Sequence, residues 1–480
     1  MKMTPYFPAF RSKLAAWGRR AATQVKTVSP SLLEHSLAHL FPPHMLSDEE
    51  EGANSRQRLF FMRRTFWSFL WQTLGAQRAC RDVVLQVKAT LALETQARMS
   101  NHTGAYVTAR HRLPLERLRA IFNHLVKRAS DATAGIDLCH GRRVMVVDAT
   151  TVQLPDTPEN QRRYPQSTRQ KPGCGFPLMK ISALFHLASG ALEAVAQTST
   201  QTHEIPLFLR LFSHLRRGDI WLGDALYGVF VMLAYSGRMG VDAIARVKRP
   251  RRLDFRKGRK LGPNERVVQW NKPKKKPGYL SERIWAVLPK TLDLRLIRVT
   301  LFREGFRPLR FYVVTTLLDD VKYPAELIAS LYLRRWRLEL CFRDLKTSLG
   351  MEALRTKTPA MAEKELLMFL IAHNMIRCLM AEASAIHAQP LDAISFMGAV
   401  AVARQYCHSL AQARSRRARK QLLAAMLETL AREILPFRPN RVEPRVVKRR
   451  PKPFPRMMIS RAEFRALNVA KRSGSKIKHR

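Results

Sequence analysis

Three acidic residues stand where their carboxylates could bind one metal centre. Asp148 ends the apolar run "RVMVV", and Asp224 ends a second run, "DIWLG". An aspartate at the end of a buried strand is held rigidly at the rim of a sheet, close to solvent. Glu339 follows much later, within residues 331–350, "LYLRRWRLELCFRDLKTSLG". Such a set predicts a magnesium site, because Mg²⁺ takes a few protein oxygens and completes its shell with water and phosphate.

The chemistry that this set favours is cleavage or transfer at a phosphodiester bond. Two ions about 3.5–4 Å apart activate an attacking oxygen and stabilise the leaving one. The residue types alone do not single out these acids, since Asp156, Glu159 and Asp219 lie nearby in the sequence. An aspartate at a strand end is more commonly a turn or helix-cap residue, so a purely structural role stays open at this point.

Residues 331–350 predict a single helix with two neighbouring stripes. At about 100° per residue, four polar residues fall within about 60° of one another. These four are Tyr332, Arg335, Glu339 and Lys346. The adjacent apolar stripe consists of Leu331, Leu338, Phe342, Leu345 and Leu349. The polar stripe therefore borders the buried one, at the rim of the domain. An ordinary i,i+4 ion pair would explain Arg335 and Glu339, but neither the tyrosine nor the lysine.

The charge of the chain predicts a polyanionic partner. Its 84 lysines and arginines outnumber 37 acids, which gives a net charge of +47 in 480 residues. Nucleic acid and anionic membranes are the usual polyanions. A ribosomal-type protein is the plainest alternative, but such proteins are rarely this long or 46% hydrophobic. The most apolar stretch, residues 365–383, is interrupted by His373, Asn374 and Arg377, so we expect no membrane span. We expect nucleic acid as the partner.

The cysteines and the N-terminus bear on location. Six cysteines are scattered singly without a CxxC pair, which argues against a zinc ribbon and fits free thiols in a reducing compartment. The N-terminal residues are basic but lack a continuous apolar core, so they predict no signal peptide. A cytoplasmic protein is therefore expected.

The elements that must position these residues follow a mixed order. Residues 55–130 predict helices with a basic face. From residue 143 to residue 248, apolar runs predict three strands, a helix, a strand, a helix and a strand, with a hairpin at Ser189–Gly190. Residues 249–310 are basic and predict a β-rich insertion whose strands include "ERIWAVLP" and "LRLIRVTLF", and "LRFYVVTTL" predicts the strand that follows. The chain is then helical to about residue 435.

The polar stripe and both aspartate blocks resemble a known family. The spacing Tyr332-x2-Arg335-x3-Glu339-x6-Lys346 matches the YREK signature of the DDE transposases of the insertion sequence four family. The blocks that contain Asp148 and Asp224 are similar to its first and second aspartate blocks, and the resemblance spans roughly residues 100–455. It implies an α/β (α+β mixed) fold. This fold has a ribonuclease-H-like mixed sheet with flanking helices, a β-rich insertion before the glutamate helix, a helical N-terminal domain and a helical C-terminal region.

The resemblance also implies a reaction and its residues. Asp148, Asp224 and Glu339 would be the catalytic residues and the ligands of two Mg²⁺ ions, with Mn²⁺ able to substitute. The implied DNA contacts are Tyr332, Arg335, Arg343 and Lys346. The implied reaction is cut-and-paste transposition, in which hydrolysis at the element ends frees a 3′-OH that attacks target DNA. The implied partners are double-stranded DNA, as terminal inverted repeats and target, and a second copy of the chain in the DNA complex; the location would be bacterial and nucleoid-associated.

Departures and alternatives remain open at this stage. Ala149 stands where the family often has glycine, and Ala225 where arginine is common, which removes a positive charge beside the metals. Trp270 and Trp285 predict either base stacking or core packing. The alternative functions are an inactive or domesticated DNA-binding descendant and a stand-alone nuclease. The expected domains are a basic segment at 1–45, a helical, DNA-binding domain at 46–138, a catalytic domain at 139–365 with the insertion at 249–310, a helical region at 366–437 and a basic tail at 438–480.

Overall fold

The described residues of the chain fall into two units. The computed structural model describes residues 30–47, 59–75, 79–94, 99–248, 255, 257–302, 307–436 and 457–467. The first unit groups Met1–Leu113 with Val400–Leu430, and the second groups Pro114–Ala399 with Ala431–Arg480. Each has a hydrophobic cluster of its own. Most of the predicted basic N-terminal segment and of the basic tail lies outside the described residues.

The first unit is helical, as its sequence periodicity predicts. Its elements are α2 (Pro30–Leu37), η1 (Ala38–Leu40), η2 (Pro43–Leu46), α3 (Met62–Leu74), α4 (Cys80–Glu94), α5 (Gly104–Arg112), most of α14 (Phe396–Ala411) and most of α15 (Arg416–Arg432). Aromatic side chains fill its interior. Phe41 stacks on Trp67 with ring centroids 5.8 Å apart, and Phe66 meets Trp67 edge-on at 5.3 Å.

The second unit is built on one mixed sheet. Its strands are β1 (Val144–Gln153), β2 (Leu178–His186), β3 (Leu192–Ser199), β4 (Ile220–Gly223), β5 (Asp242–Arg246), β6 (Arg259–Gly262), β7 (Glu265–Asn271), β8 (Thr291–Leu301) and β9 (Leu309–Thr315). Their order is β3-β2-β1-β4-β5-β9-β8-β7-β6. β2 runs antiparallel to β1 and β3, whereas β1, β4 and β5 are parallel. This arrangement is ribonuclease-H-like, and the predicted fold class is confirmed.

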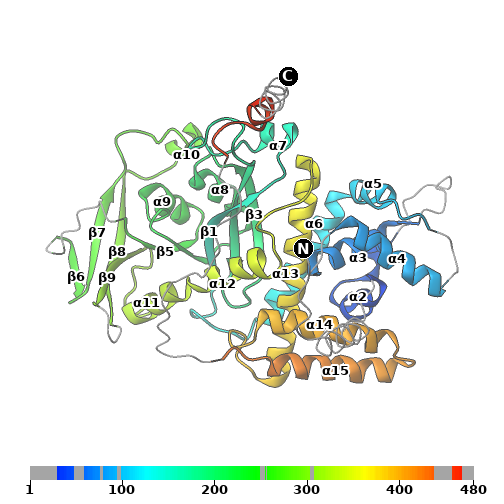
Figure 1. Ribbon diagram of the computed structural model, residues 1–480. Coiled ribbons are helices and arrows are strands. Elements are labelled where there is room, and N and C mark those ends of the chain that lie inside the picture. The colour runs from blue at the N-terminus through cyan, green and yellow to red at the C-terminus, as the bar shows by residue number, and fades with distance from the viewer. Residues whose placement is uncertain are drawn as a thin grey trace, which may run out of the picture. The chain divides into compact units, whose positions relative to one another are not determined.

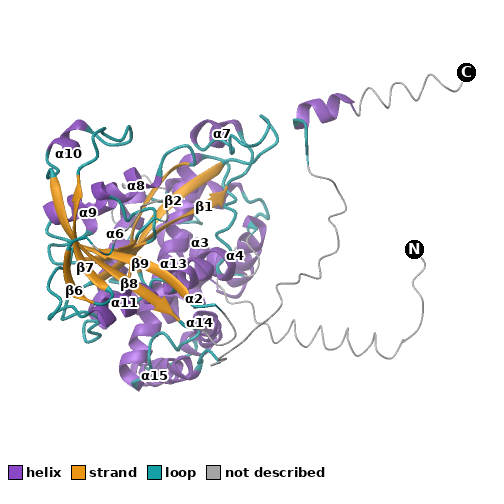
Figure 2. Cartoon of the chain, turned by 90° about the vertical axis from the view of Figure 1, so that its left-hand side faces the viewer, coloured by secondary structure: helices purple, strands orange, loops and turns teal. Residues whose placement is uncertain are grey.

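The insertion lengthens this sheet instead of forming a separate one. β9 pairs antiparallel with β5, with Val314 opposite Ala245, and β8, β7 and β6 follow it (Figure 2). The strand predicted at "ERIWAVLP" is wrong, because this segment contains the helix α10 (Glu282–Ala286). The reason is a helix cap: the Ser281 hydroxyl accepts a hydrogen bond from the Ile284 N–H, which favours a helix start over an extended chain.

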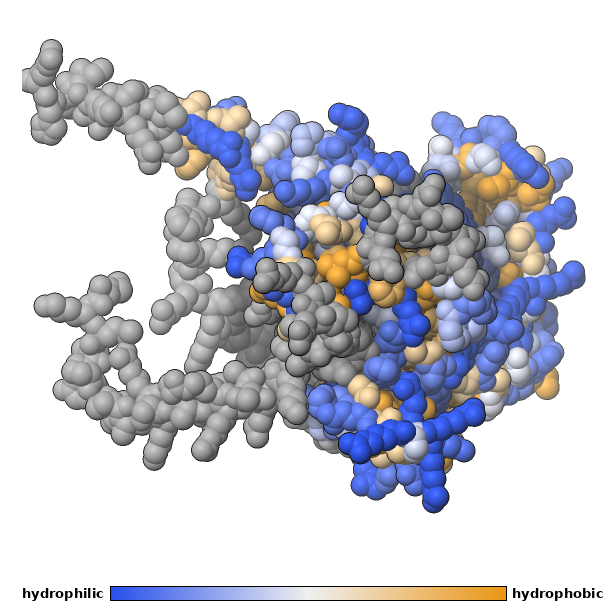
Figure 3. Space-filling model, turned by 90° about the vertical axis from the view of Figure 1, so that its right-hand side faces the viewer, coloured by the Kyte–Doolittle hydropathy of each residue, from blue (hydrophilic) through white to orange (hydrophobic). Residues whose placement is uncertain are grey.

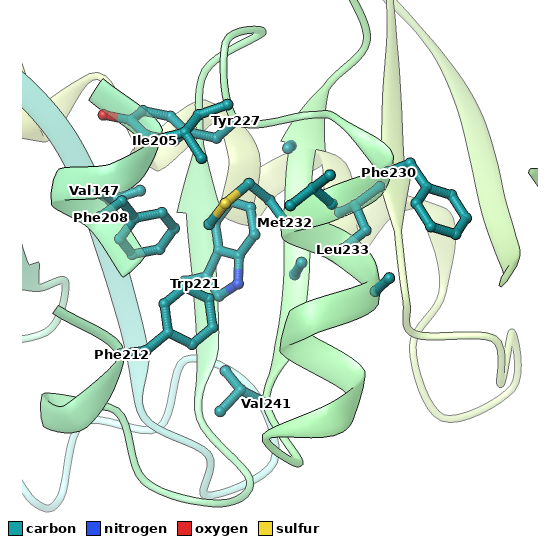
Figure 4. Packing of buried hydrophobic residues seen from close by; sticks show 14 of the residues in the cluster. Val147, Ile205, Phe208, Phe212, Trp221, Tyr227, Phe230, Met232, Leu233 and Val241 are labelled. Carbon is teal, nitrogen blue, oxygen red and sulfur yellow. The ribbon is translucent and has the colours of Figure 1, made fainter. Parts of the chain in front are cut away.

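Helices cover both faces of the sheet. α8 (Glu204–Leu211) and α9 (Phe230–Arg238) pack on one face, where their side chains form one cluster with Met145 and Val147 of β1 (Figures 1 and 4). Because side chains alternate along a strand, Val146 and Asp148 point to the opposite face. Contacts on the rest of the sheet come from α6 (Leu115–Ala132), α11 (Ala325–Arg334), α12 (Arg337–Arg343) and α13 (Pro359–His387). The short helix α7 (Pro158–Arg163) connects β1 to β2.

The helix α13 is the long apolar element of this unit. It is long and apolar enough to cross a membrane by length and composition, but 89% of its most apolar window is buried inside the protein. Its buried Asn374 is bonded internally: the side chain accepts from the Leu192 N–H and donates to the Leu192 carbonyl, both at 2.9 Å. The predicted hairpin is confirmed at Gly190, whose φ of +65° and close neighbour Arg377 leave no room for a side chain.

The polarity of the surface and the burial of Trp270 and Trp285 can be compared with the sequence predictions. Figure 3 shows one face on which hydrophilic side chains predominate and hydrophobic ones form smaller patches between them. Trp270 is 7% exposed and belongs to the core of the second unit, so its core alternative is confirmed. Trp285 is half-buried against the same core, with the Lys272 ammonium 4.4 Å from its ring centre.

Candidate active site

Asp148 and Asp224 lie where β4 ends beside β1. The last β1 residue paired with β4 is Val146, opposite Leu222, and β4 itself ends at Gly223. Asp224 is therefore the first residue after β4, whereas the sequence predicted that this strand ends at Asp224 itself. The prediction that β1 ends at Asp148 is wrong: β1 continues to Gln153, because residues beyond Asp148 remain paired with β2. Because β4 is shorter than β1, the part of β1 beyond Val146 is not paired with β4. The two carboxylates lie at this open edge of β1.

Both carboxylates are anchored through one oxygen by a backbone N–H. The Ala149 N–H donates to Asp148 Oδ1 at 2.8 Å, and the Leu226 N–H donates to Asp224 Oδ1 at 2.8 Å. Burial raises the pKa of Asp148 to about 6; the Ala149 N–H opposes this, and the negative charge of Asp224 adds to it. Two neighbouring carboxylates, each with an oxygen left for a ligand, have the donor chemistry that suits a divalent cation.

The helix predicted over residues 331–350 is interrupted, so the single polar stripe is wrong. α11 ends at Arg334, α12 begins at Arg337, and residues Asp344–Ser348 form a π-helical turn. The cause lies in the hydrogen bonds: the Arg335 and Trp336 N–H groups bond three residues back, which overwinds the backbone, while the π turn underwinds it. The angles of a regular helix therefore do not describe how side chains on either side of these irregularities are placed around the axis.

Glu339 is not gathered with the two aspartates. Glu339 is exposed on α12, whereas Tyr332 and Arg335 are buried, with 4% and 8% exposure. Arg335 points to the sheet instead, with its Nη1 4.0 Å from Asp148 Oδ2. Within the part of the chain that the structure describes, no three His, Cys, Asp or Glu side chains converge closely enough to hold a metal ion. A guanidinium, not the predicted third carboxylate, therefore neighbours Asp148.

The other predicted DNA contacts are divided between the interior and the surface. The Tyr332 ring packs against Phe311 at 5.6 Å, and burial raises the pKa of its hydroxyl. The Lys346 ammonium donates to the Thr150 hydroxyl of β1 at 3.3 Å. Arg343 is exposed. The predicted apolar stripe is confirmed at the four positions whose side chains are described, all of them buried: Leu331, Phe342, Leu345 and Leu349.

Two residues near the aspartate pair escaped sequence reasoning. Glu204 is the first residue of α8, and its negative charge raises the pKa of Asp148. Tyr227 lies in the turn after Asp224, fully buried, and its N–H donates to the Asp224 carbonyl at 3.2 Å. The sequence signal for Glu204 is slight, since a first-turn glutamate of an amphipathic helix is ordinary. Only the fold brings α8 next to the end of β4.

Comparison with known proteins identifies the family. Residues 140–375 match the model of the transposase DDE domain. The chain is 28% identical over 435 residues to the transposase InsG of insertion sequence element IS4 from Escherichia coli (strain K12), covering 88% of this chain and 93% of that one. It is also 38% identical over 64 residues to the transposase of insertion sequence element IS421 from Escherichia coli, covering 13% of this chain and 17% of that one.

Among solved structures, a piggyBac transposase in a synaptic complex with hairpin DNA is similar over 84% of this chain and 86% of that one, at 9% identity and a TM-score of 0.40. The fold and the aspartate pair define a DDE transposase, an enzyme class that acts on DNA and generally depends on a divalent metal. The chain belongs to the DDE transposases of the IS4 family.

Proposed function

We propose that this enzyme moves an insertion sequence by cut-and-paste transposition. It would hydrolyse a phosphodiester bond at each terminal inverted repeat and then join the freed 3′-OH to target DNA. The observation that carries the proposal is the pair Asp148 and Asp224 at the open edge of β1, within a ribonuclease-H-like sheet. The alternative of an inactive DNA-binding descendant is not favoured, because both aspartates are present and each keeps an oxygen available for a ligand.

We propose Asp148 and Asp224 as the residues that would hold Mg²⁺, with Mn²⁺ as a substitute. Two such ions, when bound, would supply electrostatic activation of an attacking oxygen and stabilisation of a leaving one. Before DNA binds, Arg335 partly compensates the charge of Asp148 from 4.0 Å away. Glu339 would join the pair in the DNA complex, if the helical segment between α11 and the π turn changes its backbone winding there. Helix irregularities of this kind often mark functional sites, which supports the idea.

DNA contacts are assigned by charge and exposure. Arg343, exposed on the same short helix as Glu339, would bind a backbone phosphate directly. Lys346 donates a hydrogen bond to Thr150 of β1, and Arg335 lies close to Asp148 of β1. Both would therefore reach phosphates close to the aspartate pair. Tyr332 would act through Arg335, whose guanidinium lies 5.8 Å from the Tyr332 ring centre. We further propose that residues 46–138 contribute DNA binding, that the enzyme pairs two ends as a homodimer, and that it works in the cytoplasm at the nucleoid.

The proposal is tested by separating chemistry from binding in Glu339→Gln. This variant should lose Mg²⁺-dependent cleavage of end DNA while its affinity for that DNA stays within a few-fold of wild type. The matched control is Glu326→Gln, an exposed glutamate in the first turn of α11, which should cleave normally. Loss of end binding in the Glu339 variant would assign Glu339 a structural role. Unimpaired cleavage would remove it from the reaction centre.

A further inference from the structure

A guanidinium lies beside the oxygen of Asp148 that remains for a ligand. Asp148 Oδ1 accepts the Ala149 N–H at 2.8 Å, which leaves Oδ2 as the oxygen that a cation would use. Arg335 Nη1 lies 4.0 Å from this same Oδ2. The separation is longer than a hydrogen bond, so the two groups form a loose ion pair. A positive charge of the protein itself therefore stands next to the proposed cation ligand.

The guanidinium of Arg335 is buried with part of its bonding capacity unused. The residue is 8% exposed, and its Nε has no hydrogen-bond partner among the residues that the structure describes. Buried charges are normally both paired and hydrogen-bonded. A planar guanidinium suits an oxyanion that accepts two parallel N–H bonds, and a phosphate is such an oxyanion. Arg335 thus has a donor left for a DNA phosphate that enters at the open edge of β1.

Arg335 and Glu339 belong to one irregular segment of the chain. Arg335 follows directly after α11, and the Glu339 N–H bonds to the Trp336 carbonyl, three residues back, at 3.1 Å. The helix that contains Glu339, α12, contacts β1 (Figure 1). Because only four residues separate the two side chains, a change of winding that draws the guanidinium away from Asp148 also moves the Glu339 carboxylate.

We propose that Arg335 holds the free enzyme in a state of low cation affinity, and that a DNA phosphate removes this restraint by binding the guanidinium. The inference rests on the proposed function, because it concerns the order in which DNA and a cation enter the same centre. Without DNA, the charge of Arg335 opposes a cation at Asp148 Oδ2. With DNA, the phosphate neutralises that charge and draws the guanidinium away. Such a coupling is mutual, so the cation also tightens the binding of end DNA.

Mn²⁺ binding to the full-length protein, measured by electron paramagnetic resonance without DNA, tests the restraint. Arg335→Met removes the charge but keeps a long, unbranched side chain. It should raise the Mn²⁺ affinity by about tenfold, since couplings between sites usually span about 5–150-fold. Arg335→Lys keeps the charge and should bind Mn²⁺ as weakly as wild type. The matched control is Arg334→Met, which removes the same charge from the neighbouring exposed position and should change the affinity by less than about twofold.

The wild-type protein gives a second test that needs no folded variant. At saturating end DNA, with the binding of Mn²⁺ to DNA alone subtracted, its Mn²⁺ affinity should rise by about tenfold or more. Arg335→Met should show a smaller rise, because its restraint is already absent. An unchanged or lower wild-type affinity with DNA would overturn the inference. Equal rises in wild type and Arg335→Met would also overturn it, because DNA would then act by adding ligands and not through Arg335.

Two outcomes separate this inference from the proposed function. If Asp148→Asn weakens Mn²⁺ binding while Arg335→Met leaves it at or below the wild-type level, the inference is overturned and the proposed function stands. If Mn²⁺ binding does not depend on Asp148 at all, the proposed metal centre fails, and the restraint by Arg335 fails with it.

Discussion

The raised pKa of Asp148 predicts that Asp148→Asn stabilises the metal-free enzyme at neutral pH. The carboxyl has a pKa of about 6 in the folded protein against an ordinary value of 3.8. Its side chain is 26% exposed, so burial is the main cause. A difference of about two pH units corresponds to about 3 kcal/mol of folding free energy. Asparagine keeps the shape of the side chain and an oxygen that can accept from the Ala149 N–H.

The direction of the pH dependence follows from the sign of this shift. Well below pH 3.8 the carboxyl is protonated in both the folded and the unfolded chain, so it contributes no penalty. As the pH rises from about 4 to about 6, the unfolded chain releases its proton first, and the folded wild type loses stability relative to the unfolded chain. The variant has no such group. The difference in unfolding free energy should therefore be below about 1 kcal/mol at pH 4 and reach about 3 kcal/mol above pH 7.

Urea unfolding of both proteins from pH 4 to pH 8 without divalent cations measures this difference. Asp320→Asn serves as the control, since Asp320 is exposed and its replacement should change stability little at any pH. Addition of Mg²⁺ at pH 7.5 should stabilise wild type and narrow the gap, because only wild type keeps the carboxylate. Equal stabilities of wild type and Asp148→Asn at pH 7.5 would refute the electrostatic account of the pair.

Three further predictions concern packing and DNA. Phe342→Ala should cost about 3–5 kcal/mol of stability, because the ring is 9% exposed and meets Phe185 edge-on at 5.3 Å; a small change in urea unfolding would show that α12 is not held by this contact. Lys346→Met should weaken end-DNA binding and lower its salt slope by about one, and an unchanged slope would remove Lys346 from the phosphate contacts. Deletion of residues 456–480 should reduce non-specific affinity more than it changes the cleavage position, and a shifted position would contradict this role.

The strands of the sheet were predictable because buried strands consist of apolar residues that the sequence shows directly. Val144–Val147 is buried on both faces, and a strand buried in this way needs an unbroken run of apolar residues. The succession of strands and helices along the chain from residue 143 to residue 248 also followed from the apolar runs and glycine turns. The family resemblance contributed the closing step, since it named the ribonuclease-H-like arrangement that periodicity alone leaves open.

The site was less predictable because long-range contacts decide it. A regular helix was the natural expectation for residues 331–350, yet tertiary contacts of Arg335 with Asp148 and of Lys346 with Thr150 accompany irregular winding. No local pattern records such contacts. Glu204 was missed for the same reason, because its charge acts on Asp148 only once the chain has folded.

The most direct test of the central claim is strand transfer with the chemistry of each carboxylate removed in turn. A DNA fragment that contains the coding region with its flanks is incubated with the enzyme, Mg²⁺ and a supercoiled target, and the joints are sequenced. Wild type should join the 3′ ends of the element to the target. Asp148→Asn, Asp224→Asn and Glu339→Gln should each give no joints while still binding the ends. Joints formed at the wild-type level by either aspartate variant would contradict a reaction centre built on Asp148 and Asp224.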